Sequence, residues 1–233
     1  MITINNLTVS YSKEKKVINS LNLSLQEGMI HGIVGLNGAG KTTLLNTIYG
    51  LKKYDSGEIL YNGKSLKKTE ISYLVTESYF YSNITAREYL NLFKNNGFDI
   101  EQWNKLFALP IDNIIDTYST GMKKKLALLG ILKQNKPVMI LDEPFNGLDF
   151  ESTRIIRSVL LHLKKTGKTI IVTSHIIETL TNLCDYIHYL ENGKIKYNKE
   201  KSEFELFEKE LFEIIEEKNE EIISKLIDLK SED

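Results

Sequence analysis

A glycine-rich loop carries the clearest chemical signal in this chain of 233 residues. Residues 35–42 read G-L-N-G-A-G-K-T, which fits the pattern G-x-x-x-x-G-K-[ST]. Glycines let the backbone curl so that its N–H groups converge on phosphate oxygens, and a helix N-terminus behind the loop adds positive potential. Lys41 is expected to reach the β- and γ-phosphates of a nucleotide, and Thr42 to offer its hydroxyl to Mg²⁺. The stretch predicts a phosphate cradle, with contacts from Gly35, Asn37, Gly38, Ala39, Gly40, Lys41, Thr42 and Thr43.

Two adjacent carboxylates form a second candidate site. The apolar run of residues 138–141 leads directly into Asp142 and Glu143. Asp142, at the tip of a strand, is expected to bind the Mg²⁺ shell, as such acids do in P-loop ATPases. Glu143 is expected to point another way and to polarise an attacking water. Two acids in a solvated turn are the alternative, but a buried strand leading into them favours a site.

A parallel sheet is needed to bring the cradle and the carboxylates together. Short apolar strands alternate with helical stretches, which is typical of a parallel sheet covered on both faces. We expect strands at residues 29–34, 71–75, 138–141 and 169–173, helices at 41–50, 151–164 and 176–183, and a hairpin across Asn192-Gly193. Alternating apolar residues at 2–9 and 21–25, with a hairpin signal at Asn62-Gly63, predict a separate β subdomain.

Residues 76–132 interrupt this alternation with helical patterns and predict an inserted helical subdomain. Thr85 and Glu88 form a capping box that opens one helix, a second is expected at 101–109, and a third runs from near Ser119.

The nucleotide-binding domain is expected to span residues 1–202. An acidic extension, 203–233, follows it. Helical spacing there predicts amphipathic helices that cover the domain, with a dimerisation or regulatory role as the alternative; the apolar positions are Phe204, Phe207, Leu211, Ile215, Ile222, Leu226 and Leu229.

Together with the cradle and the carboxylates, further segments make residues 1–201 resemble the nucleotide-binding domain of ABC ATPases. Tyr118-Ser119-Thr120-Gly121-Met122 resembles the family signature, usually L-S-G-G-Q, with strict matches at Ser119 and Gly121. Residues 144–149 resemble the segment that ends in the D-loop, and Thr173-Ser174-His175 the segment of the switch histidine. The resemblance implies an α/β fold: a P-loop NTPase (RecA-like) core with an inserted helical subdomain and an antiparallel β subdomain.

The resemblance also assigns roles to single residues. Tyr11 matches the aromatic residue that stacks on adenine, with an exposed strand tyrosine as the alternative. Ser119 and Gly121 would bind the γ-phosphate of an ATP held by the opposite subunit. His175 would donate to the γ-phosphate of the ATP in its own cradle and help hold the attacking water, beside the base Glu143. Asp149 would communicate between the two sites, and it also suits a helix N-cap.

One segment departs from the family pattern. Residues 71–77 align with the stretch that normally carries the Q-loop glutamine, whose carbonyl binds Mg²⁺ or its water. Thr76 stands at the matching position, and Glu77 follows it. Threonine is too short to reach as far, whereas Glu77 has the reach but brings charge. The departure leaves open how the helical subdomain senses the γ-phosphate.

Composition excludes several other kinds of protein. The net charge of −1 gives no general attraction to nucleic acid, and the lone Cys184 is expected to be a small buried apolar residue. No apolar run approaches the roughly 18 residues of a membrane span.

The resemblance implies a cytoplasmic chain, peripheral at the inner face of the cell membrane. It would bind ATP and Mg²⁺, pair with a second ATP-binding subunit and drive a permease on a separate chain.

Several alternatives stay open at this point. The signature and the lysine-rich helix after it look most like the single-domain ATPases of drug, peptide or antibiotic-resistance exporters. A soluble ABC ATPase, such as one for iron–sulfur cluster assembly, is the other function class. A degenerate regulator is disfavoured because Glu143 and His175 are intact. Tyr79, Phe80 and Tyr81 are equally compatible with a docking groove for the permease and with a place in the core.

Overall fold

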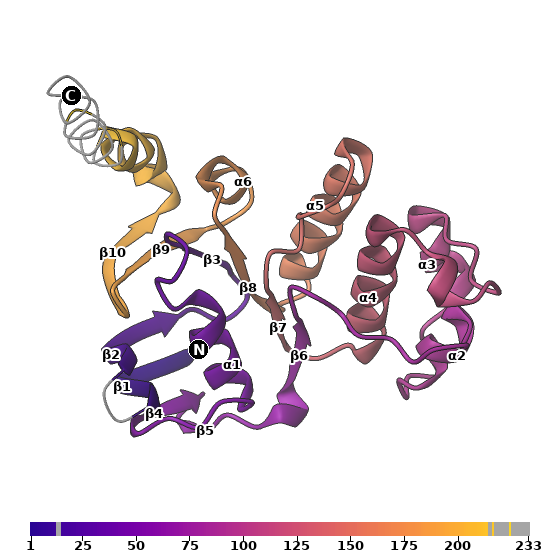
Figure 1. Ribbon diagram of the computed structural model, residues 1–233, viewed down its shortest axis with the longest axis horizontal. Helices are drawn as coiled ribbons and strands as arrows, with labels where there is room; N and C mark the ends of the chain where they lie inside the picture. Colours follow the sequence, from indigo (N-terminus) through magenta and orange to yellow (C-terminus); the bar gives the residue numbers. More distant parts are fainter. Residues whose placement is uncertain (13–14, 214–215, 217–223, 225–233) are drawn as a thin grey trace, which may run out of the picture.

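A six-stranded sheet organises the chain in this computed structural model, which describes residues 1–12, 15–213, 216 and 224 (Figure 1). The strand order is β10-β9-β3-β8-β7-β6. Five of these strands run parallel and β10 is antiparallel to β9. The bounds are β3 Ile30–Val34, β6 Ile71–Leu74, β7 Val138–Leu141, β8 Thr169–Ser174, β9 Tyr186–Glu191 and β10 Lys194–Glu200. The predicted parallel sheet is confirmed.

Both faces of this sheet are buried, which explains why its strands are continuous apolar runs. In β7, Met139 and Leu141 pack into the core shared with the helices. Val138 and Ile140, which alternate with them, pack into a second core on the other face. Because successive side chains of a strand point to opposite faces, an uninterrupted apolar run is what a doubly covered sheet requires.

The second core is closed by helix α1 and by an antiparallel sheet of order β2-β1-β4-β5. The bounds are β1 Ile2–Ser12, β2 Lys15–Leu25, α1 Lys41–Tyr49, β4 Ser56–Tyr61 and β5 Lys64–Ser65. Asn62 and Gly63 join β4 to β5 with φ values of 49° and 75°, both left-handed, so the predicted hairpin turn is confirmed.

Helices α5 (Phe150–Lys165) and α6 (Ile177–Thr181) contribute to the first core on the opposite face. Residues 204–213 are also helical, and they lie beside β9 and β10 in Figure 1. Phe207 packs edge-on against Tyr189 and Tyr197, with ring centroids 6.3 and 5.8 Å away. Phe204 and Leu211 are buried as well, so this part of the extension covers the domain. The expected helical positions Ile215, Ile222, Leu226 and Leu229 lie outside the described residues.

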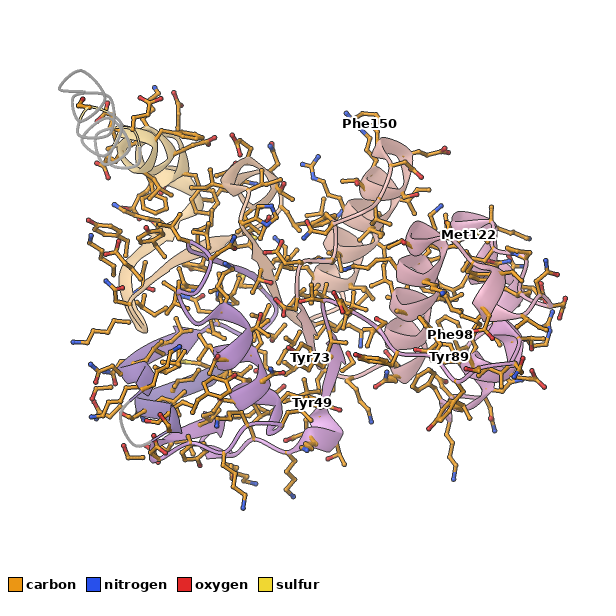
Figure 2. All side chains as sticks on the ribbon, in the orientation of Figure 1. Tyr49, Tyr73, Tyr89, Phe98, Met122 and Phe150 are labelled. Carbon is orange, nitrogen blue, oxygen red and sulfur yellow. The ribbon has the colours of Figure 1, made fainter. Side chains whose placement is uncertain are left out.

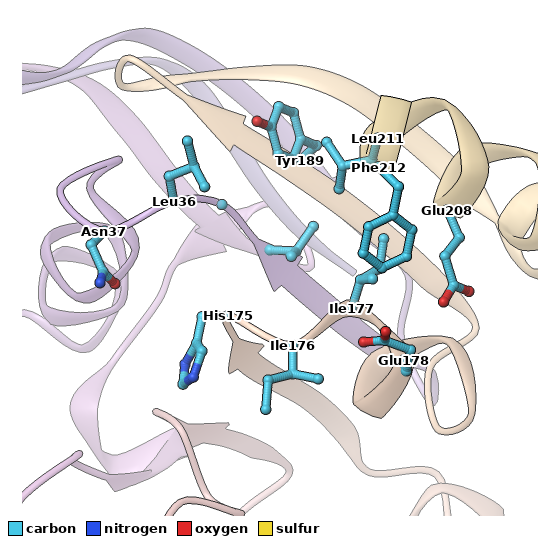
Figure 3. Close-up of a pocket in the computed structure, with 12 residues that line it drawn as sticks. Leu36, Asn37, His175, Ile176, Ile177, Glu178, Tyr189, Glu208, Leu211 and Phe212 are labelled. Atoms are coloured by element: carbon cyan, nitrogen blue, oxygen red, sulfur yellow. The ribbon is translucent and has the colours of Figure 1, made fainter. Parts of the chain in front are cut away.

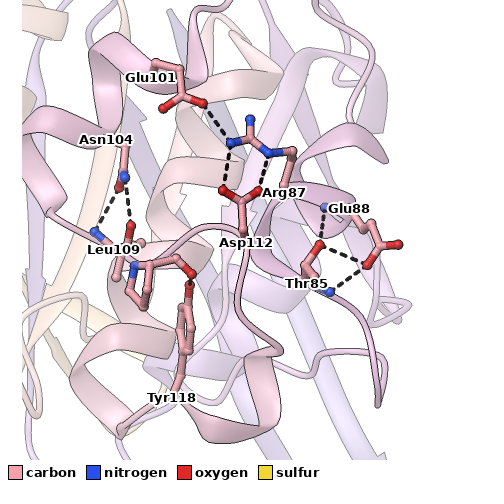
Figure 4. A network of polar contacts seen from close by, with 9 residues as sticks. Thr85, Arg87, Glu88, Glu101, Asn104, Leu109, Asp112 and Tyr118 are labelled. Carbon is pink, nitrogen blue, oxygen red and sulfur yellow. Dashed lines mark hydrogen bonds and ion pairs between the residues drawn. The ribbon is translucent and has the colours of Figure 1, made fainter.

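Helices α2 (Ala86–Asn91), α3 (Ile100–Phe107) and α4 (Thr120–Gln134), with the loops between them, form a helical lobe at one end of the molecule (Figure 1). Figure 4 shows the polar contacts that fix its loops. Arg87 donates to both Asp112 and Glu101, at 2.6 and 2.8 Å. The Thr85–Glu88 capping box forms as predicted, with mutual side-chain to backbone bonds.

Two helix ends differ from the sequence-based expectation. The helix expected at residues 101–109 ends at Phe107, because Ala108 takes a left-handed φ of 50° as the C-cap and Asn104 bonds both backbone groups of Leu109. The helix expected at 176–183 is the shorter α6. Among the helices described, none combines the length and apolar character that crossing a bilayer would require.

Candidate active site

The carboxyl ends of β3, β6, β7 and β8 meet at one edge of the large sheet, where parallel α/β sheets commonly bind ligands. A cleft of about 540 Å³ opens there. Most of the predicted site residues line it, although they come from segments far apart in the sequence: Tyr11, Asn37, Gly38, Gly40, Lys41, Thr42, Thr43, Thr76, Asp142, Glu143 and His175.

The glycine-rich loop wraps around the Lys41 side chain. Its Nζ donates to the carbonyls of Gly35 and Leu36, at 2.6 and 3.3 Å. Gly40 is the N-cap of α1 at φ 108°, a value that side chains disfavour, so the sharp entry into the helix needs glycine here. Burial lowers the pKa of Lys41, and the nearby carboxylates of Glu143 and Asp142 oppose that shift. The ammonium is held inside the loop, facing both acids.

Asp142 is 1% exposed and its carboxylate accepts three hydroxyl hydrogen bonds. Oδ2 accepts from Thr42 at 3.0 Å and from Thr76 at 2.8 Å. Oδ1 accepts from Thr173 at 2.6 Å. A buried carboxylate is costly unless it is bonded in this way. The Thr76 hydroxyl reaches Asp142 because β6 lies directly beside β7. That threonine is too short to bind Mg²⁺ as a glutamine would stays a prediction.

Glu143 points away from Asp142, as predicted, and its backbone is held in an unusual conformation. Its φ of 50° is left-handed, and its N–H donates to Thr173 Oγ1 at 2.9 Å. The side chain is 12% exposed, and Oε2 lies 3.2 Å from His175 Nδ1. Since a carboxylate only accepts, the Nδ1–H of His175 is the donor in this pair. The bond orients the imidazole toward the same cleft as the acid.

The oxygen atoms around Asp142 suit Mg²⁺. That ion prefers hard oxygen ligands, and it is usually bound by one or two carboxylates together with substrate phosphates. Among the described residues, no group of three or more histidine, cysteine or acidic side chains forms a cage for a metal ion. One carboxylate with the neighbouring hydroxyl of Thr42 instead matches an ion that arrives with phosphates. Glu77 is exposed and does not line the cleft.

Tyr11 closes the far end of the cleft. The side chain is 61% exposed, and its hydroxyl lies 3.3 Å from Thr43 Oγ1 at the start of α1. Lys52 Nζ sits 4.4 Å from the ring centroid. A planar, exposed ring fixed beside the loop offers a stacking surface.

Ser119, Gly121 and Asp149 do not line this cleft. Ser119 is the exposed N-cap of α4, accepting from the Met122 N–H, and Figure 2 shows Met122 on the helical lobe, far from α1. Gly121 lies beside the segment before α5, since an added Cβ would be 3.3 Å from the Gly147 carbonyl oxygen. Asp149 caps α5 by accepting from the Ser152 N–H at 2.7 Å, and this bonding lowers its pKa.

A second cavity, of about 380 Å³, lies behind the glycine-rich loop (Figure 3). Leu36 and His175 contribute to one wall, and Leu211 and Phe212 of the C-terminal helix to another. Its lining is mainly apolar but includes the carboxylates of Glu178 and Glu208. The start of the extension therefore packs close to the site, while none of its described residues lines the cleft of Lys41 and Asp142.

Sequence reasoning missed three residues that the structure places at the site. Thr173 bonds both Asp142 and the Glu143 backbone, and Asn146 lines the cleft. Lys124 of α4 is 7% exposed and reaches the Thr76 carbonyl. Spacing from Ala127 and Leu128 indicates that Lys124 lies on a buried face of the helix, but nothing in the sequence indicates its partner.

Known proteins resemble most of this chain. The family described as ABC transporter matches residues 18–146. The lantibiotic transport ATP-binding protein SrtF of Streptococcus pyogenes is 31% identical over 209 residues, covering 86% of this chain and 91% of that protein. A solved structure described as an ATP binding subunit of an ABC transporter has a TM-score of 0.78 and 25% identity, covering 86% of this chain and 90% of that one.

A second solved structure shows the fold alone, at 23% identity and a TM-score of 0.75, covering 86% of this chain and 99% of that one. It is described as a dimeric, post-hydrolysis state of the ATP-binding cassette MJ0796, bound to ADP and Pi. The family match, the relative and the cleft agree with one another: this chain belongs to the ABC transporter family, as an ATP-binding cassette with the P-loop fold.

Proposed function

We propose that this chain is the ATP-hydrolysing subunit of a transporter whose membrane-spanning part is a separate chain. The observation that carries the proposal is the cleft itself. It gathers the phosphate loop, the acid at the end of β7, Glu143 and His175 at one sheet edge. A cradle for phosphates beside an acid that can activate water is what hydrolysis of a nucleoside triphosphate needs.

Each part of the cleft has a chemical task. The loop N–H groups and Lys41 bind the phosphates, with Thr43 and Tyr11 at the nucleoside end. Thr42 and Asp142 would hold Mg²⁺, with Thr76 beside them. When bound, the ion neutralises charge on the phosphate oxygens. Glu143 orients and deprotonates water. His175 bonds the Glu143 carboxylate and donates to the γ-phosphate, so that acid and phosphate stay side by side.

The exposed signature tip supports a two-chain site. Ser119 and Gly121 present a hydroxyl and an N–H at the N-terminus of α4, yet they lie outside the cleft of their own chain. A second subunit related by a two-fold axis places its tip over this cleft and receives this chain's tip in return. ATP then joins the subunits, and its hydrolysis releases them. That change is the work delivered to the membrane partner.

The transported cargo is proposed from the relative. The Streptococcus pyogenes protein is named for lantibiotic transport, and we infer export of a peptide or drug-like compound here. The chain would work at the cytoplasmic face of the membrane, held there by the permease. Tyr79 is 92% exposed and Tyr81 71% exposed, whereas Phe80 packs against Tyr89. The two tyrosines therefore suit a docking surface, and Phe80 suits the core.

Co-purification and reconstitution test this function. The full chain, tagged in its native host, is expected to bring down a multi-span membrane protein. The purified pair in liposomes should hydrolyse ATP faster than the chain alone and transport a peptide in an ATP-dependent manner. ATP hydrolysis by the chain without such a partner, together with normal peptide export in a strain lacking the chain, would contradict the transport role.

A further inference from the structure

A buried lysine connects the helical lobe to the acid edge of the cleft. Lys124 lies on α4, five residues after the N-cap Ser119, and is 7% exposed. Its Nζ donates to the main-chain carbonyl of Thr76 at 3.1 Å. Burying an ammonium is costly, so a lysine that remains there must be compensated by partners close by.

The charges of Asp142 and Glu143 compensate for the burial of the Lys124 ammonium. Burial lowers the pKa of Lys124, while the charges of Asp142 and Glu143 act in the opposite direction. The ammonium of Lys124 is therefore within the electrostatic influence of both acids of the cleft, although the residue belongs to the lobe that carries the signature tip.

Thr76 completes the connection with two of its polar groups, the main-chain carbonyl and the side-chain hydroxyl. Its carbonyl accepts from Lys124, and its hydroxyl donates to Asp142 at 2.8 Å. A continuous path of two hydrogen bonds therefore runs from α4 to the acid at the tip of β7. Thr76 also lies just after the end of β6, where the chain leaves the sheet for the lobe.

We propose that Lys124 is a positioning residue that couples the signature helix to the metal-binding edge through Thr76. The inference rests on the proposed ATPase function and deepens it. A Mg²⁺ ion held by Asp142 would compete with the hydrogen bond from the Thr76 hydroxyl, and a change at Thr76 would reach α4 through the Lys124 ammonium. The Thr76 hydroxyl and the Lys124 ammonium together connect the lobe to the metal-binding edge, a connection that the threonine side chain alone is too short to make.

The test compares Lys124→Met with Lys123→Met, a change of the partly exposed neighbour on the same helix, in the full-length chain. For Lys124→Met, kcat for ATP hydrolysis is expected to fall about tenfold, the loss of one charge-assisted hydrogen bond, with KM nearly unchanged. Lys124→Arg should recover most of kcat. Lys123→Met should behave as the unaltered chain.

Hydrogen exchange gives a readout independent of turnover. Addition of Mg²⁺ and ATP should protect the backbone amides of residues 119–125 in the unaltered chain and in Lys123→Met, and should leave them unprotected in Lys124→Met. Thr76→Val breaks the other end of the path and should give the same loss, so the proposal stays testable if Lys124→Met fails to fold. In the double variant, kcat should fall no further than in the worse single variant.

Equal kcat and equal protection in Lys124→Met and Lys123→Met would overturn the coupling role while leaving the ATPase function standing. Multiplicative losses in the double variant would also overturn it, because independent effects multiply. An unaltered chain that neither binds nor hydrolyses ATP would instead contradict the proposed function.

Discussion

The cradle edge and the signature tip are built in opposite ways. At the cradle edge, the two acids and the loop lysine are bonded within the chain: Asp142 to three hydroxyls, Lys41 to two carbonyls, and Glu143 to His175. At the tip, Ser119 is exposed and its hydroxyl accepts only a local bond from the next turn. One region is a finished site, and the other presents donors outward.

The difference indicates which part of the site one chain builds by itself and which part acts on a partner chain. A pre-organised cradle binds phosphates without rearrangement, since its buried charges are already compensated. Outward-facing donors at a helix N-terminus attract an anion that their own chain does not bring to them. Four changes break or sharpen this contrast, and the effects are expected to decrease in the order given.

Lys41→Ala should produce the largest effect. Removing the ammonium that occupies the loop should lower ATP hydrolysis about 10⁴-fold and weaken nucleotide binding, because phosphate charge is left uncompensated. Steady-state hydrolysis and titration with a fluorescent ATP analogue measure the two effects. Lys16→Ala, an exposed change on β2, is the control. Binding as tight as in the control would remove Lys41 from the cradle.

Glu143→Gln should separate binding from chemistry at the finished site. The amide keeps the size of the side chain but cannot accept a proton, so hydrolysis should fall about 10³-fold while ATP still binds. Light scattering after gel filtration in ATP should then detect a trapped dimer. Normal hydrolysis by this variant would show that another group is the base.

Ser119→Ala tests the outward-facing region. Loss of the hydroxyl should lower kcat about 10²-fold at saturating ATP, and loss of the N-cap should cost about 1 kcal/mol of stability. Nucleotide affinity of the isolated subunit should remain unchanged, because Ser119 lies outside its own cleft. Calorimetry at a concentration that keeps the chain monomeric checks this, and weakened affinity there would mean that the tip serves its own nucleotide.

Tyr11→Ala should have the smallest effect. Without the ring, KM for ATP should rise about tenfold with kcat almost constant, since stacking on a base acts in binding alone. Tyr11→Phe keeps the ring and loses only the contact with Thr43, so its KM should stay close to the original value. A KM that is the same for all three chains would leave Tyr11 as an exposed strand residue.

The sequence predicted the cradle edge well because its signals are local. A glycine-rich loop between a strand and a helix, and an apolar run ending in Asp142, each identify themselves within a few residues. Thr173, Asn146 and Lys124 escaped because their roles depend on what lies opposite them in space. A buried threonine at a strand end looks like any β-branched residue, and a lysine among lysines looks like solvated surface.

The environment of Thr76 likewise depends on tertiary packing that the sequence does not reveal. Side-chain length predicts that threonine does not reach Mg²⁺ as a glutamine would, but it did not reveal that the pairing of β6 with β7 brings the hydroxyl to Asp142. Helix ends were likewise misjudged where a left-handed residue such as Ala108 stops the helix before the proline does. Register and backbone conformation of this kind arise from tertiary packing, which periodicity along the chain does not reveal.

Mixing two inactive variants tests the shared site most directly. Lys41→Ala removes the ammonium from the cradle, and Gly121→Asp places a negative side chain at the signature tip, with its Cβ 3.3 Å from the Gly147 carbonyl oxygen. Each alone should be inactive. In an equimolar mixture, hydrolysis should recover to about a quarter of the unaltered rate, since half of the dimers carry one intact site of two. A mixture as inactive as its components would contradict the claim that each ATP is bound by two chains.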